Sequence, residues 1–220
     1  HSNYQEAFDK LKKQVAHGRG AISALPHMGS WELGAVAASI FDTPMFVIYG
    51  EQRNPLFNKL MTQLRTATGT EAISREDKSL FKKVVRNLKN GKILAMTNDL
   101  RSKTKGLPVQ FLGKEANLVQ GMALFAWQAG VPVIPMVAYR EGWTQHRLLA
   151  FDPIEPDPAL DKREDWIRMT QLVMSVYETE IRKRPEQYFW YNKRWILDPF
   201  ISEAAPTSGD PAEPQEKSAP

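Results

Sequence analysis

A histidine and a glutamate close together in the first third of this 220-residue chain are the clearest candidates for chemistry. The segment 25–32 reads LPHMGSWE, with His27 at the end of an apolar stretch and Glu32 five residues later. In one continuous helix, five residues would set the two side chains roughly 140° apart, and they would not meet. Pro26 and Gly29 favour a turn between them. We therefore expect His27 in a strand-to-helix turn and Glu32 in the first helical turn, reaching back to the imidazole.

Such a pair suits proton removal from a hydroxyl group. An alcohol is a poor nucleophile near neutral pH and must lose its proton as it attacks a thioester, and neutral imidazole is a suitable base for that step. A carboxylate on the other ring nitrogen fixes the tautomer and stabilises the imidazolium that forms. The acceptor hydroxyl would take the place of an enzyme serine. Ser30 is a suitable N-cap for the helix, whose free N–H groups favour a phosphate or an oxyanion.

The elements that must position this pair follow from hydrophobic periodicity and from capping and turn residues. The alternation of strands and helices predicts an α/β fold: a single domain with a central, mostly parallel (mixed) β-sheet flanked by helices. The pattern predicts strands at 21–25, 45–49, 92–96, 131–139 and 146–151, the last two adjacent, and helices at 4–15, 31–41, 55–66, 78–89, 120–128 and 164–184.

Two segments are expected to be irregular. Residues 101–117 are predicted as a long loop with one short strand at 109–112. From Thr207 onward the chain is Pro-, Ser- and Glu-rich with no apolar period, which is typical of disorder. The expected organisation is therefore one folded domain over 1–200 and a disordered acidic tail over 201–220.

Composition excludes some kinds of site and leaves others open. The chain has no cysteine, which excludes thiolate metal sites and cysteine nucleophiles. The net charge is +4, and because the tail over 201–220 carries −3, residues 1–200 carry +7. A basic body fits nucleic acid, anionic lipid, or an acidic carrier protein or coenzyme A. The basic residues are scattered without a nucleic-acid-binding motif, which argues against nucleic acid. No stretch reaches the roughly 18 to 20 apolar residues that span a bilayer.

Several blocks, in order, resemble the bacterial lipid A biosynthesis lauroyl/myristoyl acyltransferases, of the glycerolipid acyltransferase superfamily. Residues 27–32 are similar to the family's H-x-G-N-W-E block. Together the blocks span Leu25 to about Pro199. The others are Asn54-Pro55 with Arg65 and Gly69 (N-P…R…G), Gly91–Asp99 (G-x-x-V…D-Q), Gly130–Pro135 (G-A-P-V-I-P) and Pro185–Trp190 (P-E-Q-Y-L-W).

The resemblance implies roles for individual residues. His27 would be the general base and Glu32 its partner. Arg65 would bind a phosphate or carrier group, although a solvated helix position explains it equally simply. Asp99 would lie at the active-site rim, or merely close a strand. Arg53, near the position of the family's Y-R-P arginine, and Ser30 complete the expected substrate- or phosphate-binding set.

The resemblance also implies a reaction and its partners. The chain would be an acyltransferase of lipopolysaccharide biosynthesis, with acyl-carrier-protein or acyl-CoA thioester as donor, a lipid acceptor, and no metal or other cofactor. It would work on a membrane surface, the cytoplasmic face of the bacterial inner membrane, either peripherally or through an anchoring segment absent from this sequence.

Departures from the family pattern leave the acceptor open. The family's D-Q is Asp99-Leu100 here, and Ser30 replaces the Asn before the Trp. The acceptor could therefore be a lipid A precursor or similar glycolipid, or another lipid such as a lysophospholipid or aminolipid. A non-catalytic lipid- or carrier-binding domain of the same fold is a further alternative.

Overall fold

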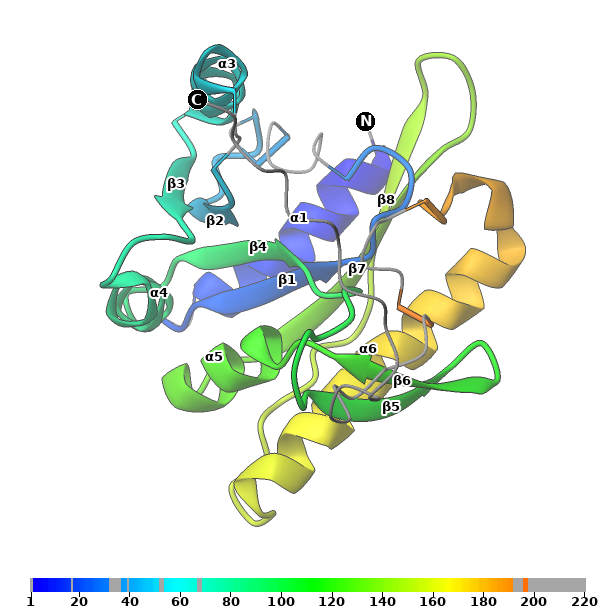
Figure 1. Cartoon of the computed structure of the whole chain (residues 1–220). Helices are drawn as coiled ribbons and strands as arrows, with labels where there is room; N and C mark the ends of the chain where they lie inside the picture. The colour runs from blue at the N-terminus through cyan, green and yellow to red at the C-terminus, as the bar shows by residue number, and fades with distance from the viewer. Residues whose placement is uncertain are drawn as a thin grey trace, which may run out of the picture.

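The computed structural model describes residues 2–16, 18–31, 37–38, 40–51, 54–66, 69–191 and 196–197. A six-stranded sheet forms its centre, in the order β3-β2-β4-β1-β7-β8 (Figure 1). The strands are β1 (Ala21–Leu25), β2 (Met45–Tyr49), β3 (Glu71–Ser74), β4 (Ile93–Thr97), β7 (Val133–Arg140) and β8 (His146–Ala150). The β1–β4, β1–β7, β2–β3 and β2–β4 pairs are parallel, and β8 runs antiparallel to β7. The predicted α/β fold with a mostly parallel mixed sheet is confirmed.

Helices cover both faces of this sheet (Figure 1). On one face α1 (Ser2–Val15) buries Phe8 and Leu11 against β1 and β8. On the other lie α4 (Leu80–Lys89), α5 (Gly121–Ala129) and α6 (Lys162–Lys183). Helix α3 (Pro55–Thr66) packs beside the edge strand β3, and the short 3-10 helix η1 (Pro185–Gln187) follows α6.

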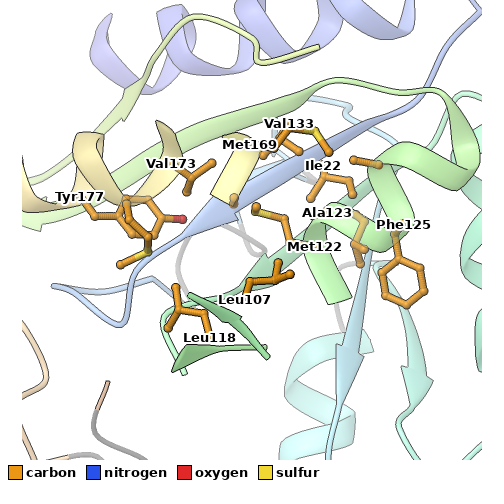
Figure 2. Packing of buried hydrophobic residues seen from close by; sticks show 14 of the residues in the cluster. Ile22, Leu107, Leu118, Met122, Ala123, Phe125, Val133, Met169, Val173 and Tyr177 are labelled. Atoms are coloured by element: carbon orange, nitrogen blue, oxygen red, sulfur yellow. The ribbon is translucent and has the colours of Figure 1, made fainter. Parts of the chain in front are cut away.

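The larger core lies between the sheet and the layer made by α4, α5 and α6. Ile22 of β1 and Val133 of β7 meet Met122 of α5 and Met169 of α6 there, all almost fully buried (Figure 2). Removal of such side chains from water contributes on the order of 1.5–3 kcal/mol each. This core holds β1 at the centre of the sheet, so the residues that follow β1 start from a fixed position.

The ends of the long elements follow the expected capping chemistry. The Asp161 side chain accepts hydrogen bonds from the backbone N–H groups of Arg163 and Glu164, which begins α6. Gly130 ends α5 in the left-handed conformation at φ 66°, as predicted. The helix predicted at 31–41 is seen at Ala37, Ala38 and Ile40, and much of the rest of it lies outside the described residues.

Two expectations about strands were wrong. The segment predicted as a long loop contains an antiparallel hairpin of β5 (Leu107–Phe111) and β6 (Lys114–Leu118), which packs on α6. Leu112 and Gly113 both have positive φ, 50° and 79°, as a two-residue hairpin turn of type I′ requires. Strand β3 was not predicted at all. It is a four-residue edge strand with only Ile73 buried, so its apolar signal is weak.

The tail over 201–220 lies outside the described residues. Of the helices within the described ranges, none combines the length and the apolar character that crossing a membrane requires.

Candidate active site

Two neighbouring parallel strands bring a histidine and an aspartate together at the carboxyl edge of the sheet. In the β1–β4 register, Leu25 is level with Thr97, the last residue of β4. His27 and Asp99 each lie two residues further along, so the pairing sets them side by side although 72 positions separate them in the chain. The carboxyl ends of parallel strands are where α/β sheets commonly bind ligands.

Asp99 receives three hydrogen-bonding contacts. Its Oδ1 lies 2.6 Å from His27 Nδ1, while its Oδ2 accepts the His27 backbone N–H at 2.8 Å and the Tyr188 hydroxyl at 3.0 Å. The Asp99 side chain is only 2% exposed, whereas the His27 side chain is 17% exposed. The carboxylate is therefore buried beneath an imidazole that keeps access to solvent.

This arrangement selects one tautomer of His27. An ionised carboxylate only accepts hydrogen bonds, so the proton of the 2.6 Å contact belongs to Nδ1. The neutral ring then has its lone pair on Nε2, the nitrogen that can remove a proton from an alcohol. The Asp99 charge stabilises the imidazolium that results. The geometry can therefore perform general-base chemistry without a covalent enzyme intermediate.

The turn that carries His27 depends on Gly29. Its φ is +57°, in the left-handed region, and its Cα lies against β7. A Cβ atom at this position would lie 2.5 Å from the Ala138 carbonyl oxygen and 2.8 Å from the Tyr139 Cα. Only glycine fits both requirements, so the close approach of the turn to β7 explains the residue type.

The segment 187–189, here named the strap, ties the His27 turn to the rest of the molecule. The Gly29 N–H donates to the Gln187 carbonyl at 2.9 Å, and the Phe189 N–H donates to the His27 carbonyl at 2.8 Å. Gln187 also bonds through its side-chain amide to both backbone groups of Arg140, at 2.7 and 2.8 Å. The strap therefore joins the catalytic turn to the end of β7.

Aromatic rings surround the imidazole. The Trp31 ring meets the His27 ring edge-on at a centroid distance of 5.2 Å, and Phe189 lies 6.3 Å from Trp31. Phe189 is 45% exposed and Tyr191 is 87% exposed. The packing role expected for Trp31 agrees with its contact on the His27 ring. An apolar surface therefore continues outward from the base.

The structure describes only some of the residues expected in the site. His27 and Asp99 come together, but Asp99 lies beneath the imidazole and not at a rim. Glu32 and Arg53 lie outside the described residues, so the Glu32–His27 contact stays a prediction. Arg65 lies in α3 and the structure does not describe its side chain, while Ser30 is partly exposed in the bend after Gly29.

Sequence reasoning missed Tyr188 as a partner of Asp99. The P-E-Q-Y block was recognised, but Tyr188 and Glu186 were expected only to secure the end of the long helix. The available signal was a tyrosine within a recognised motif that also follows the long helix back toward the sheet. Its contact with Asp99 depends on the direction in which the chain leaves α6, which a linear pattern does not contain.

Comparisons with known proteins agree with this site. The family model described as bacterial lipid A biosynthesis acyltransferase matches residues 3–196. A phosphatidylinositol mannoside acyltransferase of Mycobacterium tuberculosis (strain CDC 1551 / Oshkosh) is 24% identical over 195 residues, 86% of this chain and 59% of the relative. A lipid A biosynthesis palmitoleoyltransferase of Escherichia coli (strain K12) is 24% identical over 197 residues, 88% of this chain and 61% of the relative. The chain thus spans about three fifths of the length of these relatives.

Proposed function

The chain belongs to the bacterial lipid A biosynthesis acyltransferase family, and we propose that it moves a fatty acyl chain from a thioester to a hydroxyl of a lipid A precursor or similar glycolipid. The observation that carries the proposal is the 2.6 Å contact between His27 Nδ1 and the buried Asp99 carboxylate. That contact leaves Nε2 of a partly exposed ring as the base.

The proposed reaction is a direct transfer. His27 Nε2 takes the proton of the acceptor hydroxyl as its oxygen forms a bond to the thioester carbonyl carbon. The tetrahedral intermediate then expels the thiolate, which takes the proton from the imidazolium as the carrier thiol leaves. Asp99 stays ionised and stabilises the imidazolium between the two steps. The products are an ester and a free thiol, and no group on the enzyme is acylated.

Glu32, Arg53, Arg65 and Ser30 remain proposed contributors. Because Asp99 already bonds Nδ1, orientation of the base rests on Asp99 in this proposal, and Glu32 would act beside it. An arginine at 53 or 65 would neutralise a phosphate of the donor or acceptor. The substitutions Glu32→Gln and Arg65→Ala measure these two contributions separately.

The donor proposed is an acyl-carrier-protein or acyl-CoA thioester. Three cations, Arg101, Lys103 and Lys105, follow Asp99 within six residues. Lys103 and Lys105 are exposed, and Arg101 is partly buried. Either donor carries negative charge, on the acidic carrier surface or on the phosphates of coenzyme A, so this segment favours its approach to the site.

Exposed apolar side chains support a membrane surface as partner. Trp143 lies between β7 and β8, beyond the carboxyl end of β7, and is 95% exposed. Leu56 and Leu60, in the helix that follows β2, are 80% and 50% exposed. β7 and β2 belong to the same parallel set as β1, so these residues follow strands that end at the His27 edge. Exposed apolar groups of this kind favour insertion among lipids. We propose that this edge faces the cytoplasmic leaflet of the inner membrane.

The test of the proposed function is acyl transfer by the purified chain. Labelled acyl-carrier-protein and acyl-CoA are offered separately with a glycolipid, a lysophospholipid and an aminolipid acceptor. We expect an esterified glycolipid with the wild type, and a rate lower by about 10²–10⁴-fold with His27→Ala. Because the His27 side chain is partly exposed, the variant should keep the same circular dichroism and melting temperature.

Other outcomes would redirect the proposal. Transfer to the lysophospholipid or aminolipid alone would keep the chemistry and replace the acceptor. Lipid binding without turnover of either thioester would favour a non-catalytic binding domain. Near-wild-type transfer by His27→Ala would remove the mechanism altogether.

A further inference from the structure

The Asp99 carboxylate can orient His27 only if its own plane is fixed. A carboxylate can rotate about its terminal bond, and the side-chain torsion of Asp is broad. Oδ1 must stay on His27 Nδ1, so the rotation has to be stopped at Oδ2. Two donors meet Oδ2: the His27 backbone N–H at 2.8 Å and the Tyr188 hydroxyl at 3.0 Å. The backbone group belongs to the residue that is to be oriented, and Tyr188 is the independent anchor.

We propose that Tyr188 is a positioning residue that holds the Asp99 carboxylate in the plane required by the imidazole of His27. The inference rests on the proposed function in so far as His27 is the base of the reaction. It adds a third member to the pair, with the order Tyr188 hydroxyl, Asp99 carboxylate, His27 imidazole.

The Tyr188 hydroxyl is a lasting donor. The residue is 5% exposed, and its ring lies against Phe111 and Trp190 at centroid distances of 6.5 and 5.1 Å. Burial and then the nearby Asp99 charge raise the pKa of the Tyr188 phenol above its ordinary value. The phenol therefore stays protonated through the range in which an imidazole base works, and donates to Asp99 throughout.

The strap positions this hydroxyl together with the backbone of the base. Tyr188 pairs with Met28 in an isolated antiparallel bridge, and the Phe189 N–H bonds the His27 carbonyl. One short segment thus holds His27 through its backbone and Asp99 through the Tyr188 side chain. A shift of the strap would move the base and its acid together and would preserve their mutual geometry.

Tyr177 offers a matched control. It is also fully buried, and its hydroxyl donates at 2.7 Å to the Asn98 side-chain oxygen, one residue before Asp99. Tyr177 belongs to the buried cluster drawn in Figure 2. Both Tyr→Phe substitutions remove one buried hydroxyl and one hydrogen bond, but only the Tyr188 hydroxyl bonds the carboxylate.

The experiment compares Tyr188→Phe with Tyr177→Phe in steady-state transfer and in proton NMR of the full chain. For Tyr188→Phe we expect kcat to fall about 10- to 100-fold with KM within about twofold of wild type, because an orienting partner is lost without a substrate contact. For Tyr177→Phe we expect kcat within about threefold of wild type. The far-downfield proton of the short Nδ1–H bond, identified by its loss in His27→Ala, should weaken or move upfield only in Tyr188→Phe.

The two readouts separate this proposal from the proposed function. The NMR signal needs no substrate, so it tests the positioning role even if the wild type transfers no acyl group to any acceptor offered. An unchanged downfield proton in Tyr188→Phe would overturn the proposal. So would equal losses of kcat in the two variants, or a loss expressed in KM alone. A loss confined to Tyr188→Phe in both readouts supports it.

Discussion

The two edges of the central sheet both carry an acid with bonded partners, and they differ in what those partners are. At the amino edge, Glu71 accepts hydrogen bonds from Lys92 at 2.7 Å and from Asn87 at 3.1 Å, beside a cavity of about 230 Å³. At the carboxyl edge, Asp99 bonds His27 and Tyr188. Lysine keeps its charge near neutral pH, whereas imidazole exchanges a proton there.

The comparison shows that a hollow and a buried charge do not by themselves make a reactive site. Glu71 is neutralised by a partner that stays charged, so the pair stabilises the edge of the sheet and leaves no group to move a proton. Asp99 is matched to a ring that can gain and release one. The identity of the partner therefore assigns chemistry to the carboxyl edge and a structural role to the amino edge.

Removal of one carboxylate from each edge should separate these roles most strongly. Asp99→Asn keeps the size of the side chain but offers an N–H to His27 Nδ1, so acyl transfer should fall by about 10³-fold or more. Glu71→Gln should leave kcat unchanged. Parallel transfer assays of the two variants check this, and equal rates in both would contradict the assignment.

The Gly29 turn gives the next effect, because the catalytic edge depends on a close backbone approach. Gly29→Ala should destabilise the fold by more than about 3 kcal/mol, since the new Cβ would clash with β7. Gly130→Ala is the control: its φ is +66°, but nothing lies within 4 Å of the new Cβ. That variant should lose only about 1–2 kcal/mol. Denaturant unfolding of both measures the difference, and similar losses would show that the approach to β7 is unimportant.

Membrane contact should also differ between surfaces. Trp143→Ser removes a 95% exposed ring beyond the carboxyl end of β7, and should weaken binding to anionic vesicles by about tenfold. Leu172→Ser, on α6 and 43% exposed, should leave binding unchanged. Vesicle sedimentation checks both, and a loss only with Leu172→Ser would assign the membrane to another face.

The amino edge should reveal itself in the pH dependence of stability. Hydrogen bonding from Lys92 lowers the pKa of Glu71 below its ordinary 4.5. The folded state therefore gains stability from the charged acid above that value and loses it as the pH falls through the lowered pKa. Because the pair is partly exposed, the effect should stay below about 1 kcal/mol. Lys92→Met should flatten this dependence between pH 5 and pH 3 in chemical unfolding, without changing acyl transfer at neutral pH; an unchanged dependence would contradict the pair's role.

The periodic elements of the fold were within reach of sequence reasoning. Strands at 21–25 and 45–49 and the helix at 55–66 agree with β1, β2 and α3 at both ends, because apolar runs bounded by turn residues are local signals. The β5–β6 hairpin was missed because its turn uses Leu112, a residue that rarely adopts positive φ. Strand β3 was missed because a short edge strand buries little.

The base was predictable and its partner was not. His27 follows an apolar strand and stands in a recognised block, so its position in the turn could be inferred. The choice of Glu32 as partner relied on nearness in the sequence. The Asp99 contact depends on β4 being the neighbour of β1, and the strand order is a tertiary property. Sequence reasoning named Asp99 but placed it at the rim.

The central claim is that His27 and Asp99 act as one catalytic unit, and a double-mutant cycle of acyl transfer tests it most directly. The rates of His27→Ala, Asp99→Asn and the double variant are compared with wild type. Residues that act as a unit are strongly non-additive, so the double variant should be no slower than His27→Ala alone. Full wild-type activity of Asp99→Asn, or losses that multiply in the double variant, would contradict the account.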